Sequence, residues 1–244
     1  MRMIPFAVRN AKEIVRDPIN LGFGLGFPLV LLVLLHTMQR NIPINLFEIG
    51  RLAPGIAVFG LSFMSLFAAT LIAKDRESAF LQRLYTSPMR GGDFIWGYML
   101  PLLPIALAQV VVVYAVAVAL GLGLSLNLLY AVLGMIPVAV FFIALGLLCG
   151  SLLGVKQVSG LCGALLTNLS AWLSGVWFEL SLMGSVFERV ARLLPFVHAV
   201  ELERALLVGE LGEALVHLVP ILLYGIATTA IAILCFLHKK KEQA

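Results

Sequence analysis

Charged side chains are scarce in this sequence. The 17 basic and 13 acidic residues amount to 12% of the 244 residues, whereas 61% of the residues are hydrophobic and the mean hydropathy is +1.03. Soluble domains carry about 25% charged residues, so a soluble globular protein is excluded. A disordered chain is excluded as well, because too few charges remain to keep it solvated. The composition predicts a membrane protein, whose structural unit is an apolar run of about 20 residues.

Cysteine is rare, and the sequence has no familiar catalytic or nucleotide-binding motif. The three cysteines lie in apolar runs without CxxC spacing, which disfavours a disulfide or metal role. The sequence contains no GxxxxGK[ST], HExxH or GxSxG. Without GxxxxGK[ST], the chain alone cannot build a P-loop site for ATP. His198 and Glu201 could share a metal at i, i+3, but a solvated outer helix face is the better interpretation. We therefore expect no enzymatic activity, no metal and no cofactor in this chain.

Six long apolar runs predict an all-α integral membrane protein with six transmembrane helices. The runs are continuous and lack the strict alternation of a β-barrel strand. No charged residue lies near the centre of a predicted span, which weakens an ion-coupled mechanism. The expected spans are residues 19–38, 52–73, 94–124, 128–155, 158–178 and 216–237.

The basic residues predict the orientation of these spans. About 12 of the 17 fall on one face, in the N-terminal flank, the loop 74–93, the fourth-to-fifth loop and the C-terminal tail, and 5 fall on the other. Because loops rich in Lys and Arg stay in the cytoplasm, both termini are expected inside. Membrane topology thus explains the excess of basic residues behind the net charge of +4, and we expect no nucleic-acid partner.

Three segments are expected outside the bilayer core. Residues 1–17 predict an amphipathic interfacial helix among the lipid headgroups, although a plain basic flank is the alternative. The loop 74–93 predicts a short cytosolic helix at 78–86, whose apolar side chains need the bilayer or another protein to cover them. The region 179–215 is either a broken helical hairpin entering the outer leaflet, with Gly184 as the break, or an ordinary amphipathic outer loop.

The loop 74–93 resembles the cytosolic loop of ABC-2 type exporter permeases, in which an acidic residue and a leucine-rich turn end at a Thr/Ser-Pro step. A second similarity is LSGVWF at residues 173–178, and a third is the Leu-Pro step at 194–195 with an arginine nine residues later. This chain departs from many members by having Glu179 and Gly184 where they have proline. The matching residues of the loop are Glu77, Leu81, Leu84, Thr86, Ser87 and Pro88.

The resemblance implies the membrane subunit of a type V fold ABC exporter in a prokaryotic cell membrane. It implies a dimer with a second copy or a paralogue, and a separate cytosolic ATP-binding cassette ATPase that holds ATP and Mg²⁺. The short helix of the loop would be the coupling helix that contacts this ATPase. The residues expected to make this coupling are Glu77, Phe80, Leu81, Arg83, Leu84, Tyr85 and Pro88.

The resemblance also implies that the second and fifth spans line the path of the cargo between protomers. Aromatic and thioether side chains there would suit an amphipathic cargo such as a drug, antibiotic, peptide or lipid-like molecule. An exporter of lipid-linked polysaccharide is the alternative in the same fold, and an ion-coupled carrier or an assembly factor is the alternative in another class. The expected path residues, which could equally pack helices or face lipid, are Phe59, Phe63, Met64, Phe67, Asn168 and Trp172.

Overall fold

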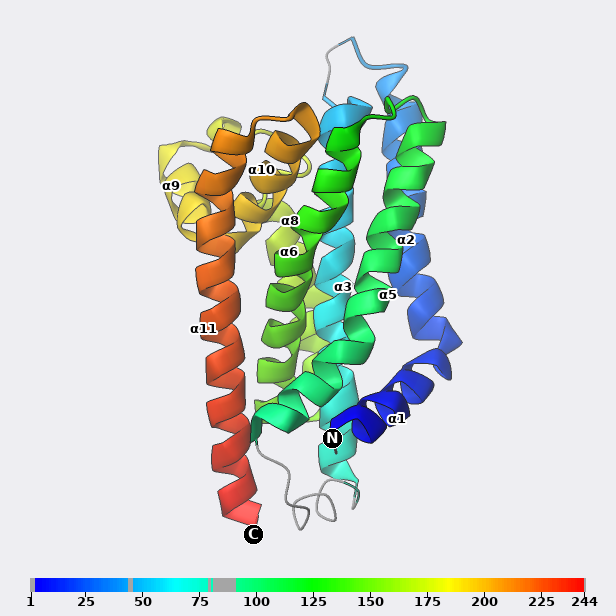
Figure 1. Cartoon of the computed structure of the whole chain (residues 1–244). Coiled ribbons are helices and arrows are strands. Elements are labelled where there is room, and N and C mark those ends of the chain that lie inside the picture. Colours follow the sequence, from blue (N-terminus) through cyan, green and yellow to red (C-terminus); the bar gives the residue numbers. More distant parts are fainter. Residues whose placement is uncertain (1–2, 44–45, 79, 81–90, 244) are drawn as a thin grey trace.

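The computed structural model describes residues 3–43, 46–78, 80 and 91–243, and this part of the chain is an elongated bundle of helices without strands (Figure 1). The predicted all-α class is therefore confirmed. The helices are α1 (Met3–Val15), α2 (Pro18–Gln39), α3 (Ile49–Glu77), α5 (Gly91–Ala119), α6 (Leu126–Leu152), α7 (Val155–Val158), the π-helix η1 (Ser159–Leu166), α8 (Thr167–Leu173), the 3₁₀-helix η2 (Leu180–Met183), α9 (Ser185–Leu193), α10 (Pro195–Val208) and α11 (Leu211–Gln243).

Five of these helices are long and apolar enough to cross a membrane, namely α2, α3, α5, α6 and α11. They coincide with five of the six predicted spans. The predicted span 158–178 is instead divided into α7, η1 and α8, and none of these pieces has spanning length by itself. The Thr167 hydroxyl donates to the carbonyl of Cys162, five residues back, at the wide turns of the π-helix (2.9 Å).

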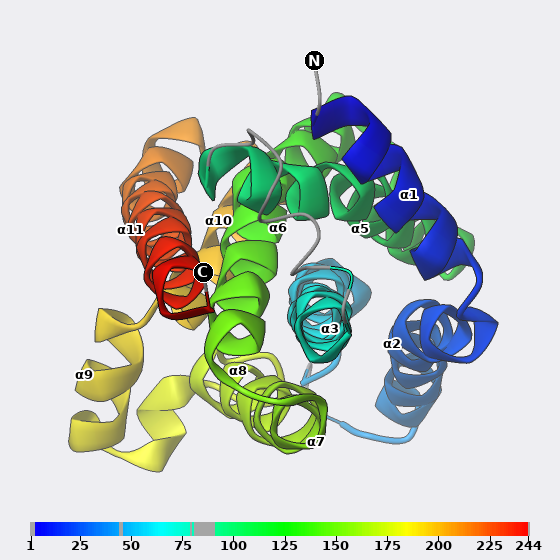
Figure 2. The same ribbon diagram turned by 90° about the horizontal axis from the view of Figure 1, so that it is seen from below.

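The helix α3 is the central helix of the bundle. It is enclosed by α2, α5, α6 and the α7–α8 segment when the molecule is viewed along its length (Figure 2). The contact with α6 is especially close, because Gly146 and Gly150 lie directly on the backbone of α3 at Ser65 and Ala69. A Cβ atom at either glycine would overlap that backbone, so these two positions require glycine for close helix packing.

The helix α5 bends in its first half, where it contains Pro101 and Pro104 (Figure 1). Each proline removes one backbone hydrogen bond from the helix and so permits the bend. The first turns of α5 lie across one end of the bundle and pack against α1.

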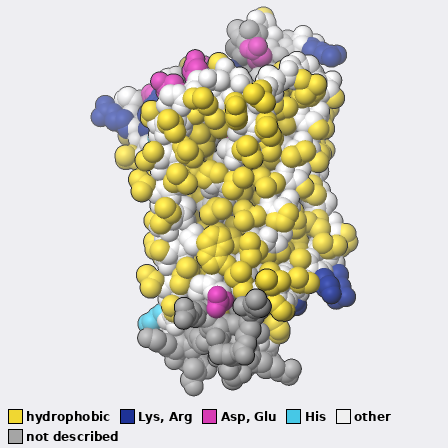
Figure 3. Space-filling model, viewed as in Figure 1, with side chains coloured by type: hydrophobic (Ala, Val, Ile, Leu, Met, Phe, Trp, Pro, Cys, Tyr) yellow, Lys and Arg dark blue, Asp and Glu magenta, His cyan; other side chains and the backbone are white. Residues whose placement is uncertain are grey.

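On the face seen in Figure 3, the described surface is apolar in the middle of the bundle and charged at its two ends. This pattern fits a bilayer around the middle, because lipid chains offer charged groups no hydrogen bonds. The helix α1 and the last turns of α11 lie at the same end of the bundle (Figure 1). The helices α9 and α10 lie at the opposite end, beside the beginning of α11.

The segment before α11 is helical and broken by one glycine. Gly184 has a φ of +94° and joins η2 to α9 at the position predicted for a break, whereas entry of this region into the outer leaflet stays a prediction. Pro195 then begins α10, where its missing N–H costs nothing at the first turn. Gly209 ends α10 in the left-handed conformation, with a φ of +90°.

Candidate functional site

The end of the bundle that holds both termini contains a buried carboxylate, Asp75, near the end of α3. Its side chain is only 3% exposed. Its Oδ2 accepts a hydrogen bond from the guanidinium of Arg9 in α1 (2.6 Å) and another from the hydroxyl of Tyr98 in α5 (2.8 Å). Burying a carboxylate is costly unless it is paired and hydrogen-bonded. Asp75 therefore ties three helices together, and we call Arg9, Asp75 and Tyr98 the inner triad.

The helix α1 is docked on α5 by one face. Its buried residues Phe6, Asn10 and Ile14 follow one another at four-residue intervals. The amide of Asn10 donates to the carbonyl of Gly97 (3.1 Å), and the ring of Phe6 lies edge-on to that of Tyr98, with centroids 4.9 Å apart. A Cβ at Gly97 would overlap the ring of Phe6. The docking therefore depends on the absence of a side chain at Gly97.

A second face of α1 is free of the bundle. The predicted apolar stripe includes Ile4, Val8 and Val15, and all three side chains are exposed, by 59%, 49% and 67%. The prediction that residues 1–17 form a helix with an apolar stripe is confirmed for Met3–Val15. The sequence did not reveal the docked face, because the polar Asn10 stands in its middle.

Arg9 connects the inner triad to the loop 74–93. Its guanidinium carbon lies 4.2 Å from the centroid of the Phe80 ring, and it also pairs with Glu13. Burial by itself lowers the pKa of Arg9, but the hydrogen bond and charge of Asp75, together with the charge of Glu13, outweigh burial and raise it. Arg9 therefore stays cationic, and it holds Phe80, one of the predicted coupling residues, against α1.

The last turn of α3 is also fixed to the turn between α6 and α7. Arg76 donates to the carbonyls of Gly150 (2.8 Å) and Leu153 (3.2 Å), which satisfies acceptors at the C-terminus of α6. The carboxylate of Glu77 accepts from the N–H of Val155 (2.9 Å), the first residue of α7. The predicted coupling residue Glu77 thus lies where α3 meets the α6–α7 turn.

The other predicted coupling residues cannot be placed in the same way. The structure describes Ser78 and Phe80 of the expected short helix 78–86. The rest lie outside the described residues, and their role stays a prediction: Leu81, Arg83, Leu84, Tyr85 and Pro88.

The predicted path residues of α3 are covered within the single chain. Phe59 and Phe63 are 6% and 7% exposed and pack on Ala171 of α8, and Met64 is completely buried. Phe67 is partly buried. Their proposed contact with cargo would therefore need a movement that uncovers them, and it stays a prediction.

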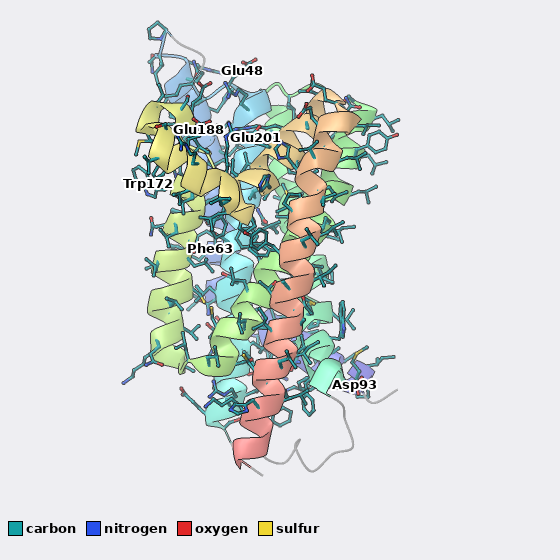
Figure 4. All side chains as sticks on the ribbon, turned by 90° about the vertical axis from the view of Figure 1, so that its left-hand side faces the viewer. Glu48, Phe63, Asp93, Trp172, Glu188 and Glu201 are labelled. Carbon is teal, nitrogen blue, oxygen red and sulfur yellow. The ribbon has the colours of Figure 1, made fainter. Side chains whose placement is uncertain are left out.

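The predicted path residues of α8 are exposed. Trp172 lies on the outer side of α8 and is 49% exposed, whereas Phe63 lies further inside (Figure 4). Asn168 is exposed too, and its amide donates to the carbonyl of Ala164 in the preceding turn (2.7 Å). The single chain therefore does not bring the two predicted groups onto one surface.

At the opposite end of the bundle, one arginine joins two of the sequence segments singled out above. Arg204 of α10 donates to the carbonyl of Gly175 in the LSGVWF segment (3.0 Å) and to the carboxylate of Glu201 (2.9 Å). Gly175 has a φ of +71°, which favours glycine. Arg51, at the start of α3, pairs with Glu179 at 3.0 Å. These contacts hold the turn 174–179 between α3 and α10.

A family model described as ABC-2 type transporter matches residues 6–208, which include most of α1, the inner triad and the turn 174–179. No curated protein matches the sequence.

Proposed function

Because this chain belongs to the ABC-2 type transporter family and is thus a membrane transport component, we propose that it is the permease subunit of an ATP-driven exporter. A separate ATP-binding cassette subunit would bind ATP and Mg²⁺ and supply the energy. The observation that carries this proposal is the inner triad, which links the docked helix α1 to α3, α5 and the loop 74–93.

The end with the inner triad faces the cytoplasm in this proposal. It carries the basic flank of α1, Lys74 and Arg76 at the end of α3, and Lys156 in α7. The exposed stripe of α1 then lies in the inner leaflet. The continuous helical segment Val155–Leu173 supplies the sixth crossing, returning the chain to the outer side before α9 and α10.

The movement of the ATPase would reach the membrane helices through the loop 74–93. A subunit that pushes this loop acts directly on Glu77 and Phe80, and through them on the α6–α7 turn and on α1. Two permease copies would then alternate between inward and outward access. ATP can drive this cycle only because the ATPase binds the two states with different free energies.

The cargo in this proposal is amphipathic, such as a drug, an antibiotic, a peptide or a lipid-like molecule. The exposed Trp172 and Asn168 of α8 offer aromatic and amide contacts suited to such a molecule. Lipid-linked polysaccharide is the second candidate cargo. An ion-coupled carrier is less well supported, because the described span centres contain no Asp, Glu, Lys, Arg or His.

Co-purification tests the proposed partnership. The permease, expressed together with a candidate ABC ATPase subunit, should be isolated as a complex with equal numbers of the two subunits. A matched variant of the permease that lacks residues 78–86 should insert into the membrane but leave the ATPase behind. Isolation of the permease without any ATPase, from cells that make both, would favour a carrier or an assembly factor.

A further inference from the structure

Two histidines face each other where α10 packs against α11. The Nδ1 atoms of His198 and His217 are 3.0 Å apart, and the ring centroids are 5.3 Å apart. The two residues are 19 positions apart and lie on different helices. The sequence pattern had suggested only Glu201, on the same helix, as a companion of His198.

The second ring nitrogen of His198 defines its tautomer. Its Nε2 lies 3.0 Å from the carbonyl oxygen of Arg192, which can only accept a hydrogen bond. Nε2 therefore carries the hydrogen, and the Nδ1 of a neutral His198 has a free lone pair directed toward His217. The Nδ1–H of His217 donates to that lone pair when no ion is bound. Histidines that ligate metals are commonly oriented by such a carbonyl on the other ring nitrogen.

We propose that His198 and His217 form a binding site for a divalent transition-metal ion of the zinc, nickel or copper type. Imidazole nitrogen suits these ions. Two nitrogens bound tetrahedrally at about 2.0–2.1 Å from zinc are about 3.3 Å apart, so a small separation of the two rings would admit the ion. Binding moves the hydrogen of His217 from Nδ1 to Nε2 through water, a change of tautomer that leaves the ring neutral, and both Nδ1 lone pairs then point to the metal.

Charges of both signs surround the two histidines. Glu201 follows His198 by one turn of α10, and Glu213 precedes His217 by one turn of α11, so each carboxylate lies on the face of its histidine. The charges of both carboxylates reach His217, opposed by those of His198 and Arg192, and Glu201 is also paired with Arg204 at 2.9 Å. Among the described residues, no group of three or more His, Cys, Asp or Glu is arranged to hold a metal. The site therefore has two protein ligands, and water completes the coordination.

The ion would join the outer hairpin to the last helix. The helix α10 is held to the turn 174–179 by Arg204, and a metal at His198 and His217 would add a second attachment, to α11. Because the ion binds the folded arrangement, it should raise the melting temperature in proportion to the logarithm of its concentration above Kd. This consequence is independent of the transport function proposed above.

Metal binding by the full chain in lipid nanodiscs, with any affinity tag removed, tests the site. Titration with Zn²⁺ should show one ion per chain, and His198→Ala or His217→Ala should each weaken binding by roughly tenfold or more. His36→Asn, in α2, is the matched histidine control and should bind as the unaltered chain does. Cys149→Ser should also leave binding unchanged, which separates this site from the cysteines of α6 and η1.

A spectroscopic measurement keeps the test independent of how well the variants fold. The unaltered chain loaded with one equivalent of Cu²⁺ should show hyperfine coupling to two imidazole nitrogens in its electron paramagnetic resonance spectrum. Coupling to fewer than two nitrogens would overturn the proposal. So would absence of Zn²⁺ binding, binding unchanged in both histidine variants, or binding lost in Cys149→Ser.

Discussion

The guanidinium of Arg9 and the carboxylate of Asp75 are 2.6 Å apart, although 66 residues separate them in the sequence. One belongs to the short helix α1 and the other to the central helix α3, two residues before the predicted coupling residue Glu77. Through this contact, α1 supports the loop 74–93. The contact also explains why a carboxylate can be buried at this point of an apolar bundle.

Substitution of Asp75 should uncouple ATP hydrolysis from the permease without unfolding the protein. Asp75→Asn keeps an acceptor for Tyr98 but removes the charge that Arg9 faces, at a cost of about 1–3 kcal/mol. Arg9 retains Glu13, so the helix α1 should still form. We expect the variant to insert and to bind the ATPase, but to lose most of the stimulation of ATP hydrolysis by the permease.

The control for this variant is Glu13→Gln. Its pair with Arg9 is partly exposed, and such pairs contribute about 0–1 kcal/mol. Equal losses of stimulated ATP hydrolysis in Asp75→Asn and Glu13→Gln would contradict a special role for Asp75.

Gly97→Ala should displace α1 from α5. The new Cβ would overlap the ring of Phe6, which cannot move without leaving Tyr98, and overpacking of this kind costs about 1–3 kcal/mol. Hydrogen exchange should therefore increase across Met3–Val15. Gly92→Ala is the matched control, since no atom lies within 4 Å of its added Cβ. Unchanged exchange in Gly97→Ala would show that α1 is not docked in this way.

A charge at Leu84 or Tyr85 should interrupt coupling without preventing insertion. Both residues belong to the predicted coupling helix and lie outside the described part of the chain. Leu84→Asp or Tyr85→Asp would place a charge in the apolar contact expected with the ATPase, where an unpaired charge is costly. Normal export by either variant would remove the assignment of 78–86 as the coupling helix.

Arg204→Ala should loosen the turn 174–179 at the outer end. It removes the hydrogen bond to the Gly175 carbonyl and leaves Glu201 without this partner. We expect faster hydrogen exchange in residues 174–184 and altered cargo release. Arg192→Ala is the matched control, because its pair with Glu188 is exposed and lies within one helix. Equal increases of the exchange rates in both variants would argue that the hydrogen bond from Arg204 to Gly175 does not hold this turn.

The sequence predicted most of the fold because long apolar runs report directly on membrane helices. Five spans, the helix at the N-terminus and the break at Gly184 all followed from local pattern. The division of Val155–Leu173 into three helical pieces did not, since a π-helix has no simple periodic signature. The inner triad and the pair of His198 and His217 also escaped prediction, because each joins helices whose packing no local pattern specifies.

The predicted cargo path also shows that local sequence does not specify how helices pack. Phe59 and Phe63 fit an aromatic lining by composition, yet residues of α2 and α8 cover them in the single chain. Composition indicates what a face could bind, whereas packing decides whether that face is open. The exposed Trp172 and Asn168 of α8 are thus more accessible than Phe59, Phe63 and Met64 of α3.

Transport by the purified complex tests the central claim most directly. Permease and ATPase would be reconstituted together in proteoliposomes, and the movement of a fluorescent phospholipid and of an amphipathic cationic dye would be followed. The account predicts movement of at least one probe that requires ATP and both subunits, and that is lost in Asp75→Asn. Movement driven by a proton gradient without the ATPase would contradict it.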